Sequence, residues 1–144
     1  MKINQISIFI ENTKGRLAEV CTLLGDNNIN IRALTIAESP EFGILRVVVD
    51  KLQKAKDILK EHSFISTIAE IVAVEVSDDP GGLAKALQIL SKNDINVQYM
   101  YGFVEKATEK ALMVFKFEKN IDKAIEILQK NNINLVDEKT ALGL

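Results

Sequence analysis

An internal repeat constrains this chain more than any other feature of its sequence. A shift of 66 residues places Gly15 on Gly81 and brings apolar and polar positions of the two halves into register. The matched pairs are Ile8–Val74, Ile10–Val76, Leu17–Leu83, Ala18–Ala84, Leu24–Leu90, Ile29–Ile95, Asn30–Asn96 and Ile31–Val97. Repeats of this length are complete small domains rather than solenoid units. We therefore expect one domain over residues 1–67 and another over 68–144, sharing an interface because each alone buries little surface.

The first half contains alternating and helical apolar periods in a definite order. Ile6, Ile8 and Ile10 alternate with Ser7, Phe9 and Glu11, which predicts a strand, and the period then changes to that of an amphipathic helix. The expected elements are a strand around 6–10, a helix over 15–27, strands over 30–38 and 43–50, a helix from 52 to 62, and a strand over 64–70.

The second half repeats this order from a strand over 71–77. It continues with a helix over 81–93, strands over 97–104 and 110–118, a helix over 119–131 and a short strand over 133–138. Two βαββαβ units in succession predict an α+β fold of the split βαβ, or ferredoxin-like, type. Each unit should have an antiparallel sheet with both of its helices on one face.

Composition excludes several classes of function. The net charge is −2 and no basic run occurs, so duplex nucleic acid finds no electrostatic footprint. The single cysteine, Cys21, cannot form a disulfide within the chain, which favours the cytoplasm. No secretory signal is evident, and no apolar run approaches the roughly 18 residues of a membrane span, so no membrane association is expected.

The segment best suited to chemistry is the first strand-to-helix turn of each repeat. It reads Glu11-Asn12-Thr13-Lys14-Gly15-Arg16-Leu17 in the first repeat and Ser77-Asp78-Asp79-Pro80-Gly81-Gly82-Leu83 in the second. Glycine allows a ligand to approach the backbone closely, and the free N–H groups of a helix start attract a carboxylate. A neighbouring carboxylate or amide oxygen can accept from an ammonium group, so one turn offers partners to both ends of a free amino acid.

The polar residues of these turns also have structural interpretations. Asn12 and Asp78 are suited to capping a helix as well as to contacting a ligand, and both roles can coincide. Pro80 fits a helix start, where its missing N–H costs nothing. Asn30 and Asn96 either shape the entry to the next strand or contact a ligand.

The second turn and the helix after it resemble the signature of ACT domains. The resemblance rests on Asp78-Asp79-Pro80-Gly81-Gly82-Leu83-Ala84, then Leu90, then Asp94-Ile95-Asn96-Val97. The first repeat matches through Asn12, Gly15, Leu17, Ala18, Leu24 and Asn28-Ile29-Asn30-Ile31. It departs at Lys14, which stands where the second repeat has Pro80 and which could supply a charge for a carboxylate.

The resemblance implies ferredoxin-like units that pair edge to edge, with amino acids bound between units against this turn. Such units regulate amino-acid enzymes, transport or transcription, and the chain contains no attached catalytic or DNA-binding domain. We therefore expect a non-catalytic regulatory protein that binds a free amino acid, needs no cofactor or metal, and acts on a partner such as an enzyme of amino-acid metabolism. The expected ligand-binding residues are Glu11, Asn12, Lys14, Gly15, Arg16, Leu17, Asn30, Asp78, Asp79, Pro80, Gly81, Gly82, Leu83 and Asn96.

Rival functions find less support. Arg16 suggests an acylphosphatase, but its counterpart is Gly82 and no glycine-rich cradle surrounds it. A metallochaperone would need a pair of thiols, whereas Cys21 stands alone on an apolar helix stripe and is expected in the core. His62, the only histidine, is expected to cap a helix C-terminus, which leaves no nucleophile–base set. A protein-interaction subunit without a small ligand remains an alternative.

A row of aromatic residues suggests an interface. Tyr99, Tyr101 and Phe103 alternate on one predicted strand, as in modules that stack nucleic-acid bases, but no Lys or Arg accompanies the tyrosines. Packing or subunit contact explains them better. With Leu112 and Val114 on the next strand, some of them are expected to form an exposed apolar patch, which predicts a homodimer.

Overall fold

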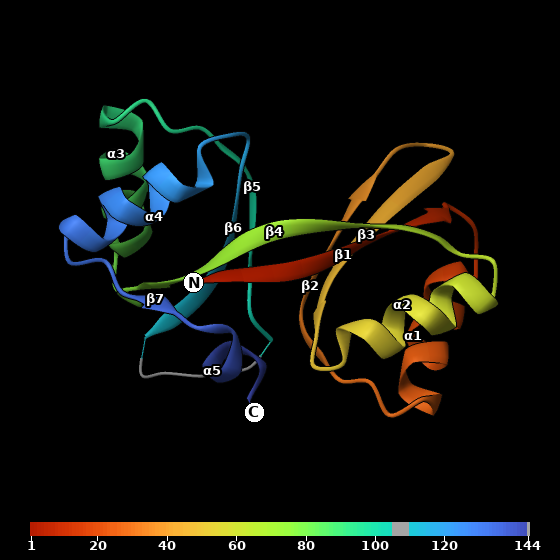
Figure 1. The fold of residues 1–144 in the computed structure, drawn as a ribbon. Coiled ribbons are helices and arrows are strands. Elements are labelled where there is room, and N and C mark those ends of the chain that lie inside the picture. The colour runs from red at the N-terminus through yellow and green to blue at the C-terminus, as the bar shows by residue number, and fades with distance from the viewer. Residues whose placement is uncertain (105–109, 144) are drawn as a thin grey trace. The chain divides into compact units, whose positions relative to one another are not determined.

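The computed structural model describes residues 1–104 and 110–143, and the chain divides into two compact units. One unit consists of Asn4–Ala69, and the other combines Glu70–Leu144 with Met1–Ile3. Figure 1 shows the elements of both units. Among the described helices, none combines the length and the apolar character needed to cross a membrane.

The first repeat supplies the elements of the Asn4–Ala69 unit. They are β1 (Lys2–Glu11), α1 (Arg16–Asp26), β2 (Ile31–Glu38), β3 (Phe42–Val49), α2 (Leu52–Glu61) and the beginning of β4 (Ile65–Val76). Strand β3 pairs antiparallel with β1 on one side and with β2 on the other. The pairing Glu11↔Phe42 brings the end of β1 to the start of β3, next to the β2–β3 hairpin.

Both helices of this unit pack on the same face of its sheet. The buried cluster joins Val20 and Leu24 of α1 to Leu59 of α2 and to the alternating Ile6 and Ile8 of β1. Alternation along the strand and the helical period of the apolar residues place these side chains on facing surfaces.

The second repeat builds the other unit. After β4 follow α3 (Gly82–Lys92), β5 (Val97–Gly102), β6 (Ala111–Phe117), α4 (Ile121–Lys130), β7 (Leu135–Val136) and α5 (Glu138–Leu142). Antiparallel pairing gives the strand order β7-β4-β6-β5. The core cluster again joins two helices to one sheet face, with Ala86 and Leu90 of α3, Ala124 of α4 and Phe115 of β6. The predicted fold of two βαββαβ units is confirmed.

Two segments differ from the sequence prediction. The expected strands 64–70 and 71–77 form one continuous strand, β4, because no Gly, Pro or Asn interrupts the extended run Ile65–Val76. The predicted domain boundary between residues 67 and 68 lies inside this strand. The short helix α5 was not predicted; it starts at Asp137, whose carboxylate accepts from the Thr140 N–H at 2.8 Å, and it ends at Gly143 with φ 73°.

The predicted exposure of the patch formed by Tyr101, Leu112 and Val114 is wrong. Strand alternation does place these residues on the face away from α3 and α4, but their side chains are buried, while Tyr99 is half-buried. Buried residues outside the helix-side cluster also include Val136 of β7 and residues of the unpredicted α5. Alternation identifies a face, but it does not show whether that face is covered.

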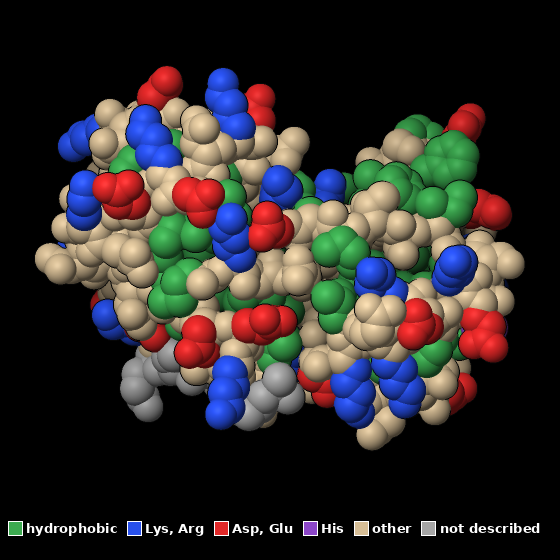
Figure 2. All heavy atoms as spheres, viewed as in Figure 1, with side chains coloured by type: hydrophobic (Ala, Val, Ile, Leu, Met, Phe, Trp, Pro, Cys, Tyr) green, Lys and Arg blue, Asp and Glu red, His purple; other side chains and the backbone are tan. Residues whose placement is uncertain are grey.

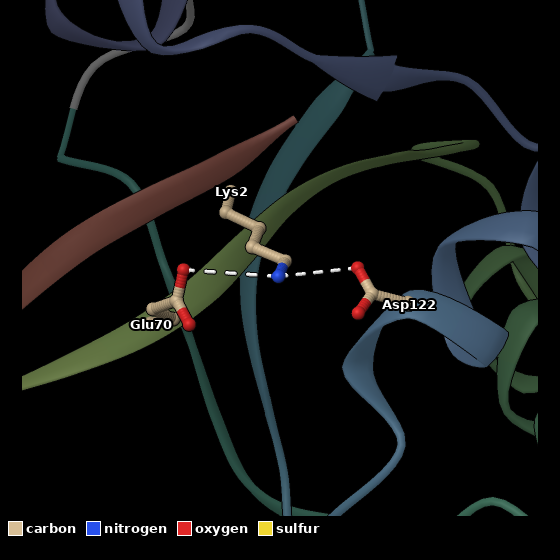
Figure 3. Close-up of polar contacts among 3 residues, drawn as sticks. All are labelled: Lys2, Glu70 and Asp122. Carbon is tan, nitrogen blue, oxygen red and sulfur yellow. Dashed lines mark ion pairs between the residues drawn. The ribbon is translucent and has the colours of Figure 1, made fainter.

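An ion-pair cluster attaches the start of the chain to the second-repeat unit. Lys2 Nζ lies 3.1 Å from Asp122 Oδ1 of α4 and 3.9 Å from Glu70 Oε2 of β4. Figure 3 shows the ammonium group between the two carboxylates. The hydrogen bond with Asp122 raises the pKa of Lys2 above its ordinary value. The first residues of the chain therefore belong to the unit that the second repeat builds, although the rest of β1 belongs to the other unit.

Candidate functional site

The turn between β1 and α1 is held by the neighbouring hairpin. Gly15 is the N-cap residue of α1, with φ 92°, and no side chain caps the helix. Asn12 instead donates through Nδ2 to the Ser39 carbonyl at 2.9 Å, and its backbone N–H donates to the Glu41 carbonyl at 2.9 Å. The proposed capping role of Asn12 is therefore wrong, because the left-handed glycine occupies the N-cap position.

The turn between β4 and α3 has the same backbone path with different side chains. Gly81 is the N-cap residue of α3, with φ 86°, and again no side chain caps the helix, so Asp78 is not the cap either. Asp79 organises the turn: its carbonyl accepts from the Gly82 N–H at 3.0 Å, and its carboxylate accepts from the Ser77 hydroxyl at 2.6 Å.

Two glycines in this second turn are needed for different reasons. Gly81 adopts a positive φ that L side chains rarely adopt, although space is open where its Cβ would lie. At Gly82 a Cβ would collide with the backbone carbonyl of Ser77. This close approach excludes any side chain at position 82.

The residue equivalent to Gly82 in the first repeat is Arg16, which makes contacts of its own. Its Nη1 donates to Glu19 Oε2 at 2.8 Å, and its guanidinium carbon lies 4.7 Å from the centre of the Phe64 ring. Its Nε is buried and has no hydrogen-bond partner within the described part of the chain. Arg16 thus packs across the start of α1, where the second repeat has no side chain.

A cavity of ≈ 120 Å³ adjoins the second turn within the same unit. Its walls are the end of β4, the first turns of α3, the start of β6 and the α4–β7 connection. The lining residues with polar side chains are Glu75, Ser77, Lys85, Lys110, Asn132 and Asn134. Apart from Ser77 in the turn itself, none of these residues could be predicted from a local pattern, because they come from segments far apart in the chain.

A shallower groove of ≈ 350 Å³ lies beside the first turn. It follows α1 from Gly15 to Asp26 and is bordered by His62 and Phe64. His62 ends α2 as predicted, with Nδ1 3.0 Å from the Ile58 carbonyl. Cys21 is half-buried rather than part of the core, and partial burial raises the pKa of its thiol.

The structure separates Asn30 and Asn96 from the turns. The N–H of Asn30 donates to Asp50 Oδ1 at 2.9 Å, beyond the end of β3 that is remote from the hairpin. Asn96 Nδ2 donates to Glu118 Oε2 at 3.0 Å, at the equivalent place in the second repeat. Each helix runs back along its sheet after the turn, so its C-terminus and the following Asn lie at the opposite end.

The other predicted site residues remain at the turns. Glu11, Lys14, Asp78, Asp79 and Pro80 are exposed to solvent. Leu17 is 42% exposed on α1, whereas its counterpart Leu83 is half-buried against the second core. No group of acidic, histidine or cysteine side chains suited to a metal ion occurs among the described residues.

Two ferredoxin-like βαββαβ units, each with a strand-to-helix turn that has a left-handed glycine at the helix N-cap, define the class of this protein. The family model of the ACT domain pair matches residues 1–144, and the chain belongs to this family.

Similar proteins extend over nearly the whole chain. The crystal structure of protein BT0572 from Bacteroides thetaiotaomicron is 39% identical, with a TM-score of 0.92, and the match covers 100% of this chain and 98% of that one. The ligand-free regulatory subunit of aspartate kinase from Thermus thermophilus shares the fold at 17% identity, with a TM-score of 0.63 and coverage of 88% and 91%. The acetolactate synthase small subunit of Buchnera aphidicola subsp. Baizongia pistaciae is 23% identical over 141 residues, which are 90% of this chain and 89% of that protein.

Proposed function

We propose that this protein is a non-catalytic regulator that binds a free amino acid at a strand-to-helix turn. The observation that carries the proposal is the turn over residues 77–83. Positions 81 and 82 carry no side chain, the turn leads directly into the start of α3, and the exposed carboxylates of Asp78 and Asp79 belong to the same turn. A helix start attracts a carboxylate group, and a carboxylate beside it accepts from an ammonium group.

In this proposal the ligand is held by both of its backbone ends. Its carboxylate accepts from main-chain N–H groups near Gly81, Gly82 and Leu83, where the Gly82 N–H would have to be shared with the Asp79 carbonyl, and its ammonium donates to Asp78 or to nearby carbonyl oxygens. Membership in the ACT domain pair family supports a regulatory role. Similarity to a regulatory subunit of aspartate kinase supports a partner among enzymes that act on amino acids.

Calorimetric titration with each of the common amino acids tests the proposal. Saturable binding of one or two of them is expected, and the absence of binding by every amino acid in the set would refute the proposed function. Asp78→Ala should weaken the best ligand by about 1.5–3 kcal/mol, roughly tenfold or more, because a charged hydrogen bond is lost. Asp57→Ala serves as the control, since it removes an exposed carboxylate of α2 that belongs to neither turn.

A second candidate function is a protein-interaction subunit without a small ligand. The observation that favours it is the apolar surface of the first-repeat unit, where Phe9 is 42% and Phe42 56% exposed. Figure 2 shows exposed hydrophobic side chains over the β2–β3 hairpin. If no amino acid binds, Phe42→Ser should still abolish copurification with a partner subunit.

A further inference from the structure

Three positions that line the cavity beside the second turn have counterparts in the first repeat that form an ion pair stacked on an aromatic ring. The repeat register equates Gly82 with Arg16 and Lys85 with Glu19. It also equates Ile133 with Phe64, each of which follows a residue of positive φ and donates to the carbonyl of the last apolar residue in its helix. The same three positions therefore hold a cation, an acid and an aromatic ring in one repeat, and line a cavity in the other.

In the first repeat the chain itself supplies both charges at these positions. The guanidinium of Arg16 stacks on Phe64 at 4.7 Å and pairs with Glu19 at 2.8 Å. The partly buried stack and the charged hydrogen bond stabilise this arrangement. The two charges are partners of each other, so this ion pair needs no external ion, while the buried Nε of Arg16 has no hydrogen-bond partner among the described residues.

In the second repeat the charge is inverted and the large side chain is absent. Position 82 must remain glycine because the Ser77 carbonyl occupies the place of a Cβ, so no side chain from this position can enter the cavity. Lys85 stands where the first repeat has Glu19, and Lys110 adds a second cation to the lining. Among the described residues, Glu75 is the one acid that lines the cavity, and strand alternation directs its side chain to the face away from α3.

The cavity is large enough to hold a carboxylate group. Its volume of ≈ 120 Å³ is several times the roughly 10–15 Å³ that one water molecule needs. Asn132 and Asn134 add amide groups that can donate to the carboxylate oxygens, whereas the Ser77 hydroxyl already donates to Asp79.

We propose that this cavity binds the side-chain carboxylate of an acidic L-amino acid, with Lys85 as its ion partner, and that each chain has one such site. The inference rests on the proposed function and narrows its ligand to aspartate or glutamate. The α-carboxylate and ammonium occupy the turn, and the second carboxylate enters the adjoining cavity. The first repeat offers no equivalent site because Arg16 already supplies the charge that pairs with Glu19.

Calorimetry with matched acid and amide ligands tests this assignment. L-glutamate and L-aspartate should each bind with a stoichiometry of one per chain, and the preferred acid should bind about tenfold or more tightly than its amide, L-glutamine or L-asparagine. Lys85→Gln should remove this preference while leaving amide binding unchanged. Lys123→Gln is the matched control, since it removes an exposed lysine of α4 that does not line the cavity.

The possible outcomes separate this inference from the proposed function. Binding of a neutral or basic amino acid in preference to both acids overturns the inference and leaves the proposed function standing. A Lys85→Gln variant that keeps the full acid preference, or two equivalent sites per wild-type chain, also overturns it. Failure of every amino acid to bind overturns the proposed function itself. Circular dichroism of each variant identifies any loss of folding.

Discussion

At the scale of single residues, glycine stabilises the fold at some positions of this chain and destabilises it at others. Gly81 and Gly15 permit a left-handed backbone that starts a helix, whereas Gly25 lies in the last turn of α1 with a negative φ and open space where a Cβ would lie. Replacing a glycine of negative φ by alanine reduces the entropy of the unfolded chain, while glycine at a positive φ avoids strain. The same substitution should therefore have opposite effects at the two kinds of position.

Gly81→Ala should destabilise the protein by about 1–2 kcal/mol, because an L side chain is strained in the left-handed region. Gly25→Ala should stabilise it by roughly 0.5–1 kcal/mol through lower entropy of the unfolded chain. Urea denaturation measures both variants. Equal effects of the two substitutions would contradict the positive φ of Gly81.

The thiol of Cys21 should be slow to react. Burial raises its pKa above the ordinary value of 9.0, so less of the reactive thiolate is present near neutral pH. Alkylation by iodoacetamide at pH 8 should proceed more slowly than in the urea-unfolded chain. A native rate equal to the unfolded rate would show that the thiol is fully accessible.

At the scale of elements, the short helix α5 depends on one cap. Asp137 accepts from the backbone N–H of Thr140, and this bond holds the pKa of its carboxyl below the ordinary value of 3.8. A depressed pKa means that the stabilisation is present above the unfolded value and is lost as pH falls through the folded one. Acid should therefore loosen α5 before it unfolds the two cores.

Hydrogen exchange of the Ala141 amide, which bonds to the Asp137 carbonyl at 2.9 Å, measures this effect. Its protection should fall as the pH drops below about 3.8, the ordinary carboxyl value. Asp137→Asn should keep α5 at neutral pH, because Asn also caps helices, and should remove the acid dependence. Asp137→Ala should lower protection at every pH, and unchanged protection in that variant would contradict the capping role.

At the scale of the whole molecule, the apolar surface is unequally divided between the repeats. Among the described residues, Phe9, Leu34, Ile36 and Phe42 of the first repeat are exposed. Their counterparts in the second repeat are Glu75, Met100, Gly102 and Lys110. Exposed apolar surface on an edge strand such as β2 marks a protein interface.

The protein should therefore form a homodimer, although Tyr101, Leu112 and Val114, on which the sequence-based prediction relied, are buried. Sedimentation at micromolar concentration should give twice the chain mass of 16.0 kDa. Phe42→Ser should shift the protein toward monomer, while Val104→Ser, at a 65% exposed position in the second repeat, should not. A wild-type chain that sediments as a monomer would refute the prediction.

The sequence by itself determined the repeat, the order of elements and the face of each strand that enters its core. These features depend on local periodicity, on glycine in the two turns and on apolar positions such as Ile8 and Val74, and all of these can be seen in the printed chain. The candidate turns at Gly15 and Gly81 were visible for the same reason, since their backbone geometry is set by neighbouring residues.

Only the tertiary structure decided which remote residues meet at those turns. It brought Lys110 and Asn132 to the second turn and placed Asn30 and Asn96 at the far ends of their units. It also buried Tyr101, which lies on the sheet face away from the helices, where strand alternation alone does not show whether a side chain is covered. These outcomes depend on how distant segments pack against one another, and no local pattern in the sequence encodes that packing.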